Sequence, residues 1–238
     1  ASMASAFYAV AAALDDAAIA AEATQAIDGL FERMRDADGL LYHVAAPGAA
    51  PSVRGLLSDQ VAYVRALIDA HERTGEARFL ERAIAHADLT IARFGAKDGG
   101  FYDSARIEEQ LGNLVIADRP VAENGLFADA LLRLALLTGA ETYRETAERA
   151  LALYARTVER AGWFASPYLR ALRRYLSPEV CIRIVGEPGA TAELRAAAAR
   201  LPAPLLAVRT AAPADAHKLG LPASFAIAAY VCRGTICG

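Results

Sequence analysis

The chain has 238 residues, a formal net charge of -3 and a pI near 5.9. Hydrophobic residues make up 55% of it and charged residues 22%, which supports a sizeable core and excludes disorder over most of the chain. The slightly acidic balance argues against a surface for a phosphate backbone, so we expect no nucleic-acid partner.

The N-terminal segment, residues 1–14, is rich in alanine but does not resemble a signal peptide, because it lacks a basic region and runs into the acidic pair at 15–16. No segment stays apolar for the ~20 residues that a membrane span needs. We therefore expect no membrane association and a cytoplasmic location. Three cysteines, Cys181, Cys232 and Cys237, are too few for a disulfide framework and also favour a reducing compartment.

A repeat of helical hairpins organises the middle of the chain. Thr74-Gly75 followed by Phe79 is matched further along by Thr138-Gly139 followed by Tyr143, with the same spacing inside each motif. Each Thr-Gly pair follows an apolar stretch, which predicts an inner helix, and precedes a more charged stretch, which predicts an outer helix. Glycine suits the turn because it adopts the left-handed conformation that ends a helix. The predicted inner helices cover residues 56–73 and 125–137, and the outer helices cover 77–94 and 141–160.

A third and less regular copy precedes these two. Its predicted helix, residues 15–35, leads into the sequence 38–42 (Asp-Gly-Leu-Leu-Tyr), which is matched one repeat later by 98–102 (Asp-Gly-Gly-Phe-Tyr). About three hairpins are therefore present, the minimum for a stacked repeat. The turns at Thr-Gly are short, whereas the returns at 43–55 and 103–120 are long. Because long loops more often carry function, we expect the functional side at these returns.

The pattern changes after the third hairpin. A short helix is followed by two apolar runs that flank another helix, which predicts a β-α-β unit, and a final apolar run suits one more strand. The helices are expected at 166–176 and 190–201, and the strands at 180–185, 205–208 and 224–232. We accordingly divide the chain into a helical hairpin repeat at 1–176, a partial α/α toroid, and a small α/β segment at 177–238.

Several of these landmarks together resemble one protein family. They are Leu57-Ser58-Asp59-Gln60, Glu72 to Glu76 with Phe79-Leu80, Asp98 to Asp103, Asn124 ahead of Leu131 to Leu134, Val185-Gly186 and Cys232 to Cys237. From about residue 15 to its end, the chain resembles the C-terminal part of the thioredoxin-domain-containing proteins related to spermatogenesis-associated protein 20. In that family a thioredoxin-like domain precedes an (α/α)6 toroid similar to N-acylglucosamine 2-epimerase and the six-hairpin glycosidases.

The resemblance implies a mainly α fold, an incomplete (α/α) toroid of about three helical hairpins with a small C-terminal α/β segment. It implies the fold better than it implies an activity. Two departures limit what it carries. The sequence has no thioredoxin-like domain with a Cys-x-x-Cys motif, and where relatives resemble Pro-Ser-Gly-Asn this chain reads Pro120-Val121-Ala122-Glu123-Asn124.

Two polar pairs, at 59–60 and 123–124, open the predicted inner helices at equivalent positions of the repeat. A carboxylate beside an amide offers the donors and acceptors that a polyhydroxyl ligand needs, tyrosine rings stack on sugars, and two carboxylates can act as an acid and a base. We therefore expect catalytic roles for Asp59, Glu123 and His43, and ligand-binding roles for Gln60, Tyr63, Tyr102 and Asn124.

The competing interpretation is structural, because acidic residues at a helix start also cap free backbone N–H groups. His71 and His86 are expected to be structural or surface residues. Cys232 and Cys237 are expected to be structural thiols; a disulfide and a metal site are the alternatives, although no further metal ligands lie nearby in the sequence. We expect no cofactor and no metal.

Two functions follow from these patterns. The first is a carbohydrate-binding or carbohydrate-active toroid with an epimerase- or glycosidase-like cleft and a small sugar-like ligand. The second is a non-catalytic helical scaffold that self-association, as a homo-oligomer, or a partner chain completes, because an open arc of hairpins exposes apolar surface at its ends.

Overall fold

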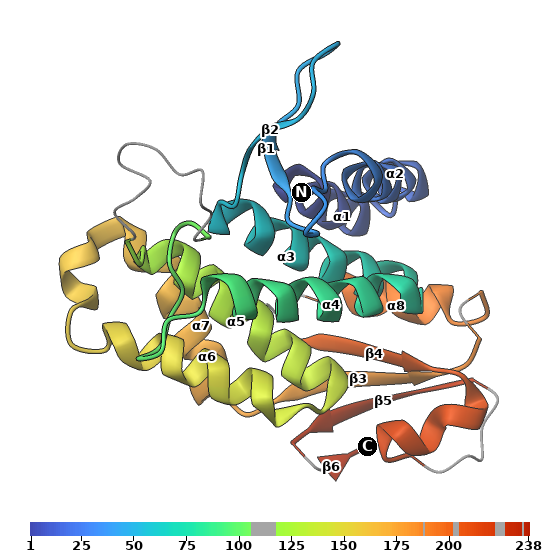
Figure 1. Ribbon diagram of the computed structural model, residues 1–238. Coiled ribbons are helices and arrows are strands. Elements are labelled where there is room, and N and C mark those ends of the chain that lie inside the picture. The colour runs from blue at the N-terminus through green and yellow to red at the C-terminus, as the bar shows by residue number, and fades with distance from the viewer. Residues whose placement is uncertain (106–117, 188, 202–204, 222–226, 235) are drawn as a thin grey trace.

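The computed structural model describes residues 1–105, 118–187, 189–201, 205–221, 227–234 and 236–238 (Figure 1). It is mainly helical with a small C-terminal sheet, so the predicted fold class is confirmed. Most of the long return at 103–120 falls outside the described residues. None of the helices in the described ranges has both the length and the hydrophobicity that crossing a membrane requires.

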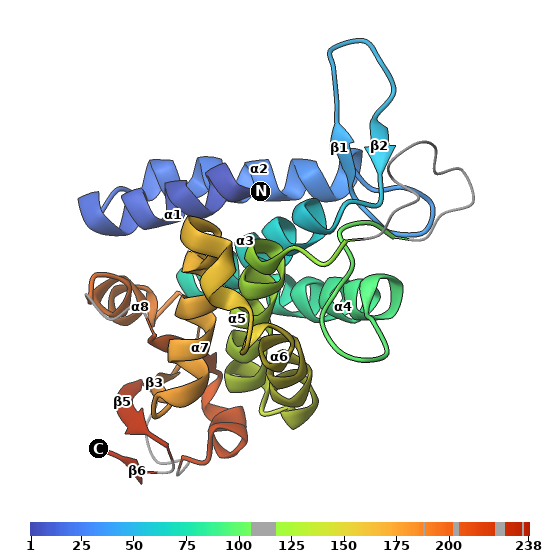
Figure 2. The same ribbon diagram turned by 90° about the vertical axis from the view of Figure 1, so that its left-hand side faces the viewer.

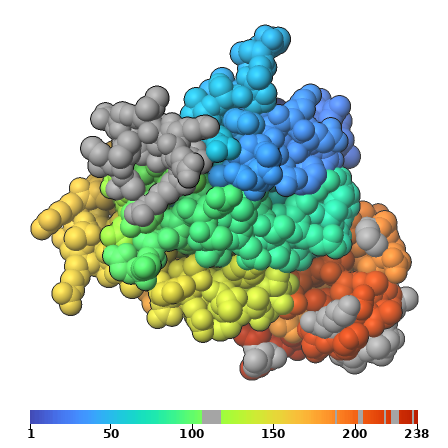
Figure 3. All heavy atoms as spheres, viewed as in Figure 1, coloured from blue at the N-terminus to red at the C-terminus, as the bar shows by residue number. Residues whose placement is uncertain are grey.

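Helical hairpins form an arc in which the inner helices pack in succession, α1 on α3, α3 on α5 and α5 on α7 (Figure 2). Figure 3, which has the same viewpoint as Figure 1, shows the outer helices one below the next. The hairpins are α1 (Ser2–Leu14) with α2 (Ala17–Arg33), α3 (Leu57–Thr74) with α4 (Ala77–Phe94), and α5 (Val121–Thr138) with α6 (Glu141–Tyr154); η2 (Val158–Ala165) and α7 (Ser166–Leu176) follow.

The first hairpin is more complete than the sequence predicted. Only its second helix was expected, at 15–35, whereas the alanine-rich start forms the inner helix α1. Asp15 ends α1 in the left-handed conformation, and the Asp16 carboxylate accepts hydrogen bonds from the backbone N–H groups of Ala18 and Ile19. This cap starts α2 and explains why the acidic pair lies at the turn.

The two Thr-Gly turns have the same geometry, as the repeat predicted. Gly75 and Gly139 adopt φ values of 75° and 78°, and their N–H groups bond to carbonyls four residues back at 2.8 Å. The preceding threonine hydroxyl donates to the carbonyl of the residue four before it and accepts the N–H of the residue two after it. Threonine and glycine therefore close each inner helix together.

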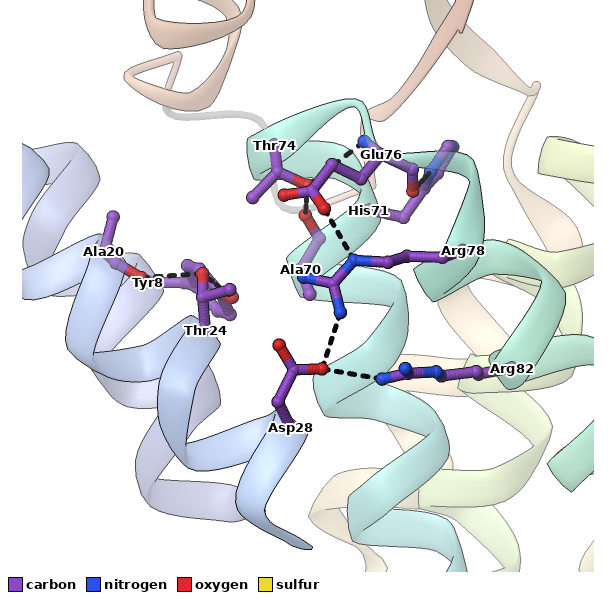
Figure 4. Close-up of polar contacts among 10 residues, drawn as sticks. All are labelled: Tyr8, Ala20, Thr24, Asp28, Ala70, His71, Thr74, Glu76, Arg78 and Arg82. Atoms are coloured by element: carbon purple, nitrogen blue, oxygen red, sulfur yellow. Dashed lines mark hydrogen bonds and ion pairs between the residues drawn. The ribbon is translucent and has the colours of Figure 1, made fainter. Parts of the chain in front are cut away.

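Neighbouring outer helices are joined by carboxylates at equivalent positions of the repeat. Asp28 on α2 bonds both Arg78 and Arg82 on α4 at 2.6 Å (Figure 4). Asp88, at the matching position of α4, accepts a hydrogen bond from the Tyr143 hydroxyl on α6 at 2.8 Å.

The contact between the inner helices α5 and α7 depends instead on the close approach of their backbones. A Cβ atom at Gly125 would lie 2.4 Å from the backbone nitrogen of Tyr168.

The C-terminal segment forms a four-stranded sheet of order β4-β3-β5-β6. The predicted β-α-β unit is confirmed, because β3 and β4 are parallel and α8 lies between them in the chain; β5 pairs antiparallel with β3. The elements are β3 (Val180–Val185), α8 (Ala192–Ala199), β4 (Ala207–Ala211), η3 (Pro213–Leu219), β5 (Ala228–Arg233) and β6 (Ile236–Cys237).

The prediction of free thiols at Cys232 and Cys237 was wrong, because the two form a disulfide. Strands β5 and β6 are antiparallel and place Cys232 directly opposite Cys237, with 4.0 Å between their Cα atoms. The sequence alone did not show that the pairing of β5 and β6 brings these two residues into register. Cys181, on β3, is a buried free thiol.

The two ends of the arc differ. At the Thr-Gly end, α8 contacts α1 and α3, and β4 contacts α3 and α5, so the C-terminal segment packs against the inner helices there (Figures 1 and 2). At the opposite end a hairpin of β1 (Tyr42–Val44) and β2 (Ser52–Arg54) projects from the body (Figure 1). We call this opposite end, where α3 and α5 begin, the long-loop end.

Candidate functional site

A histidine-carboxylate pair lies at the long-loop end. β1 supplies His43 and the first turn of α3 supplies Asp59; the His43 Nδ1 atom lies 3.0 and 3.1 Å from the two carboxylate oxygens. The side chains are 50% and 21% exposed, so both are accessible to solvent. A hydrogen bond from Nδ1–H to the carboxylate leaves Nε2 as the acceptor nitrogen of a neutral imidazole. The structure thus brings together two of the three predicted catalytic residues.

The predicted ligand-binding amides instead hold the repeat together. The Gln60 amide donates to the carbonyls of Leu41 and Leu56 at 3.2 and 3.0 Å, and its oxygen accepts the Leu41 N–H at 2.9 Å. The side chain is 0% exposed. Gln60 thereby joins the end of one hairpin to the start of the next inner helix.

Asn124 makes the same three bonds one repeat later. It donates to the carbonyls of Phe101 and Pro120 at 2.9 Å each and accepts the Phe101 N–H at 2.7 Å. Its exposed fraction is 1%. We call Gln60 and Asn124, with these backbone partners, the amide joints. Since both amides are engaged by backbone, neither of them is included in the ligand contacts proposed below.

Tyr63 lies inside the second hairpin. Its ring is 1% exposed and meets the ring of His86 on α4 edge to face, with 5.0 Å between the centroids. His86 in turn has its Nε2 2.9 Å from the Gln60 side-chain oxygen, so this nitrogen donates the hydrogen bond. Burial lowers the pKa of His86 to about 4, and the positive charge of Arg35 adds to the effect. His86 is therefore a neutral structural residue, as expected.

Glu123 and Tyr102 lie at the long-loop end, one repeat beyond the pair of Asp59 and His43. Glu123 is half-buried in the first turn of α5. The Tyr102 ring lies 5.8 Å from the guanidinium of Arg119, whose Nη1 also donates to Asp98 at 2.7 Å. The aromatic face of Tyr102 and the carboxylates of Asp98 and Glu123 therefore lie at this end of the arc.

A set of charges on the inner helices, most of them partly buried, was not predicted from the sequence. Arg133 on α5 bonds Asp69 and Glu72 on α3 at 2.7 and 2.6 Å. Arg174 and Arg170 on α7 lie 2.7 and 3.5 Å from Asp129 on α5. We call these six residues, with Arg65 on α3, the inner charge cluster. Its signal in the sequence was the presence of charged residues within helices that are otherwise apolar.

Two arginines hold Asp129 ionised. Burial alone would raise the pKa of Asp129, but the charges of Arg174 and Arg170 outweigh it and keep the pKa below the ordinary value. Beside the cluster, a cavity of about 260 Å³ lies between α1, α3 and α8, and Asp69 and Glu72 line it. The Ser5 hydroxyl, also on its wall, is buried without a hydrogen-bond partner in the described structure.

Comparisons with known proteins establish the fold class. No family model matches the sequence, and no curated protein matches it. The structure is similar to cellobiose 2-epimerase from Bacillus thermoamylovorans B4167, with a TM-score of 0.56 and 21% identity over 65% of this chain and 42% of that chain. It is also similar to the Lin0763 protein from Listeria innocua, with a TM-score of 0.51 and 16% identity over 63% and 44% of the two chains.

These similarities show an α/α toroid fold. The chain spans less than half the length of either solved structure, which agrees with an arc of hairpins rather than a closed ring. At such identities the comparisons establish architecture and not a reaction.

The amide joints predict a measurable loss of stability. Replacing Asn124 with leucine removes three hydrogen bonds and leaves buried backbone groups of Phe101 unpaired, so we expect the free energy of unfolding to fall by roughly 2–4 kcal/mol. Urea denaturation followed by circular dichroism measures this. Gln25→Leu on the exposed surface of α2 is the matched control and should change stability by less than about 0.5 kcal/mol. Equal losses in the two variants would contradict the structural role.

His86 predicts acid sensitivity. Its pKa falls from 6.5 in the unfolded chain to about 4 in the folded one, so the folded state favours the neutral form. The resulting stabilisation is complete above pH 6.5 and is lost as the pH falls toward 4, a change of about 3 kcal/mol. Urea denaturation at several pH values should show this loss. In His86→Gln, which cannot titrate but can still donate to Gln60, the slope between these pH values should be shallower; an unchanged slope would contradict the assignment.

Proposed function

We propose that this chain binds a carbohydrate at the long-loop end and acts on it by acid/base chemistry. The observation that carries the proposal is the contact between His43 and Asp59, an imidazole and a carboxylate held together on an accessible rim. Three further features support this interpretation of the pair.

The first feature is chemical. With Nδ1–H donated to Asp59, the Nε2 atom of His43 can take up a proton from a substrate, and the carboxylate stabilises the imidazolium that forms. The second is the placement of Glu123, which opens the next inner helix and supplies a carboxylate at the position equivalent to Asp59. An epimerisation beside a carbonyl needs a base to remove a proton and an acid to return it, and glycoside hydrolysis needs two such groups as well.

The third feature is the surface on which a sugar would rest. Tyr102 offers an aromatic face near the start of α5, and the guanidinium of Arg119 beside it offers hydrogen-bond donors to hydroxyl groups. The similarity to a structure named cellobiose 2-epimerase supports the ligand class only. Membership of the family related to spermatogenesis-associated protein 20, a cytoplasmic location and the division at residue 176 stay predictions.

The proposal is tested by melting the protein against neutral mono- and disaccharides. A ligand at ten times its Kd stabilises by about 1.4 kcal/mol, which should raise Tm by roughly 3–5 °C. Asp59→Asn, His43→Gln and Glu123→Gln should remove the shift while leaving the unliganded Tm within about 2 °C of the parent. The matched controls, Glu145→Gln on the outer helix α6 and the exposed His217→Gln, should keep it. Failure of every sugar to raise Tm would overturn the proposal.

A second function, an interaction module, is favoured by the surface of α1. Met3, Val10 and Leu14 are 67%, 44% and 67% exposed and fall on one face of this helix at helical spacing. An apolar stripe at the end of the arc suits pairing with the same stripe of a second copy about a two-fold axis. The chain would then function as a self-associating scaffold.

Self-association through α1 predicts a concentration-dependent dimer. Light scattering after size exclusion should give twice the chain mass at high protein concentration, because pairing removes the stripe from water. Val10→Glu should restore the monomer, whereas Val44→Glu, at a comparably exposed valine on β1, should not. A monomer at all concentrations, or equal effects of both substitutions, would rule out this interface.

A further inference from the structure

The inner charge cluster contains two pairs of repeat-equivalent positions with reversed charge. Arg65 and Asp69 on α3 correspond, one repeat later, to Asp129 and Arg133 on α5. Equivalent residues of adjacent, similarly oriented helices lie at similar heights, so each arginine should face the other helix's aspartate. One of these pairs forms, because Arg133 bonds Asp69 at 2.7 Å.

The other pair does not form. Asp129 is occupied by Arg174 at 2.7 Å and by Arg170 at 3.5 Å. Arg65 makes no ion pair within the described chain, and its Nε atom is buried without a hydrogen-bond partner. A half-buried guanidinium without a carboxylate partner is unfavourable unless a bound ligand supplies an anion.

The charges of the cluster do not balance. Four arginines, Arg65, Arg133, Arg170 and Arg174, face three carboxylates, Asp69, Glu72 and Asp129. Arg65 and Arg170 lie at a similar level of the arc, because Arg65 is the repeat equivalent of Asp129 and Arg170 lies 3.5 Å from Asp129. Burial and the positive charges of Arg170 and Arg133 lower the pKa of Arg65, although Asp69 and Asp129 act in the opposite direction. Like charges repel, and an anion between them relieves the repulsion.

The surplus positive charge lies on the solvent-accessible side of the inner charge cluster. The Arg170 side chain is 42% exposed, whereas Arg133 and Arg174 are each 11% exposed. Arg65 and Arg170 also precede Asp69 and Arg174 by four residues, about 6 Å, on helices whose starts lie toward the long-loop end. The unsatisfied positive charge is thus on the same side of the arc as the proposed carbohydrate site.

We propose that Arg65 and Arg170 bind the anionic group of a sugar derivative, a phosphate ester or a carboxylate. Guanidinium groups form paired, charge-assisted hydrogen bonds with both kinds of anion, and two such groups from different helices can hold one anion from two sides. That the anion belongs to a sugar rests on the proposed function; that the site takes an anion rests on the charge cluster alone.

Titration calorimetry on the full chain tests this with four probes: a neutral hexose, the same hexose as its 6-phosphate, the corresponding uronate, and inorganic phosphate. The anionic sugars should bind at least tenfold more tightly than the neutral hexose, and the advantage should shrink as salt is raised. Arg170→Gln should reduce this advantage at least fivefold; because the side chain is 42% exposed, the variant is expected to fold. Arg65→Met should remove it. Arg149→Gln, on the outer helix α6, makes the same charge change elsewhere and should have no effect.

The outcomes separate the two proposals. Equal affinity for neutral and anionic sugars overturns the anion site and leaves the carbohydrate proposal standing. Binding of inorganic phosphate that equals binding of the hexose phosphate, and that depends on Arg170, supports the anion site and counts against a sugar ligand. A preference for the phosphate ester over the uronate, or the reverse, identifies the source of the anion. No binding by any probe overturns the anion site, whereas the carbohydrate proposal is decided by the melting experiments with the full panel of sugars.

Discussion

The amide joints are the constraint on which the rest of the architecture depends. Each one connects three parts of the chain: the tight motif that ends a hairpin, the first turn of the next inner helix, and the backbone that leads into it. These segments consist largely of polar backbone at a place where water is excluded, so every N–H and carbonyl there needs a partner. A side-chain amide, with donors and an acceptor on one rigid plane, satisfies them at once. Without it, successive hairpins would lose their fixed relation.

Because the joints fix the hairpins, the inner helices meet at constant height and can carry charges in their interface. Arg133 pairs with two carboxylates across that interface, and Asp129 pairs with two arginines. The same cluster reaches the C-terminal segment, since Arg174 donates to the carbonyl of Leu205 at 3.0 Å. Buried ion pairs rarely add much net stability, but they strongly disfavour any packing that separates them. We infer that they specify the docking of the sheet against the Thr-Gly end of the arc.

The sequence predicted the hairpins, the Thr-Gly turns and the β-α-β unit because each depends on local rules. Glycine at 75 and 139 marks a left-handed residue, and apolar periodicity marks a buried face. The sequence did not decide the features that depend on neighbours distant in the chain. In the sequence, Gln60 and Asn124 are equally compatible with a ligand contact and with a backbone joint. Only the structure shows that the backbone of Leu41 and of Phe101 lies beside them. The disulfide needed the register of β5 and β6, which no spacing rule gives.

The two polar residues that open α3 show how structural and functional demands are divided. They are adjacent in the sequence, yet consecutive helix positions point about 100° apart. Gln60 therefore turns into the protein and is used by the fold, while Asp59 turns toward the rim and meets His43. The structural role therefore belongs to Gln60 and the candidate functional role to Asp59, so the two roles can be separated by substitution. The repeat places an acidic residue followed by an amide at the start of α3 and of α5. In each pair the amide forms the joint between hairpins, and the acidic residue is not needed for it. The concentration of accessible polar groups at this end, opposite the end packed against the sheet, then follows from the repeat itself.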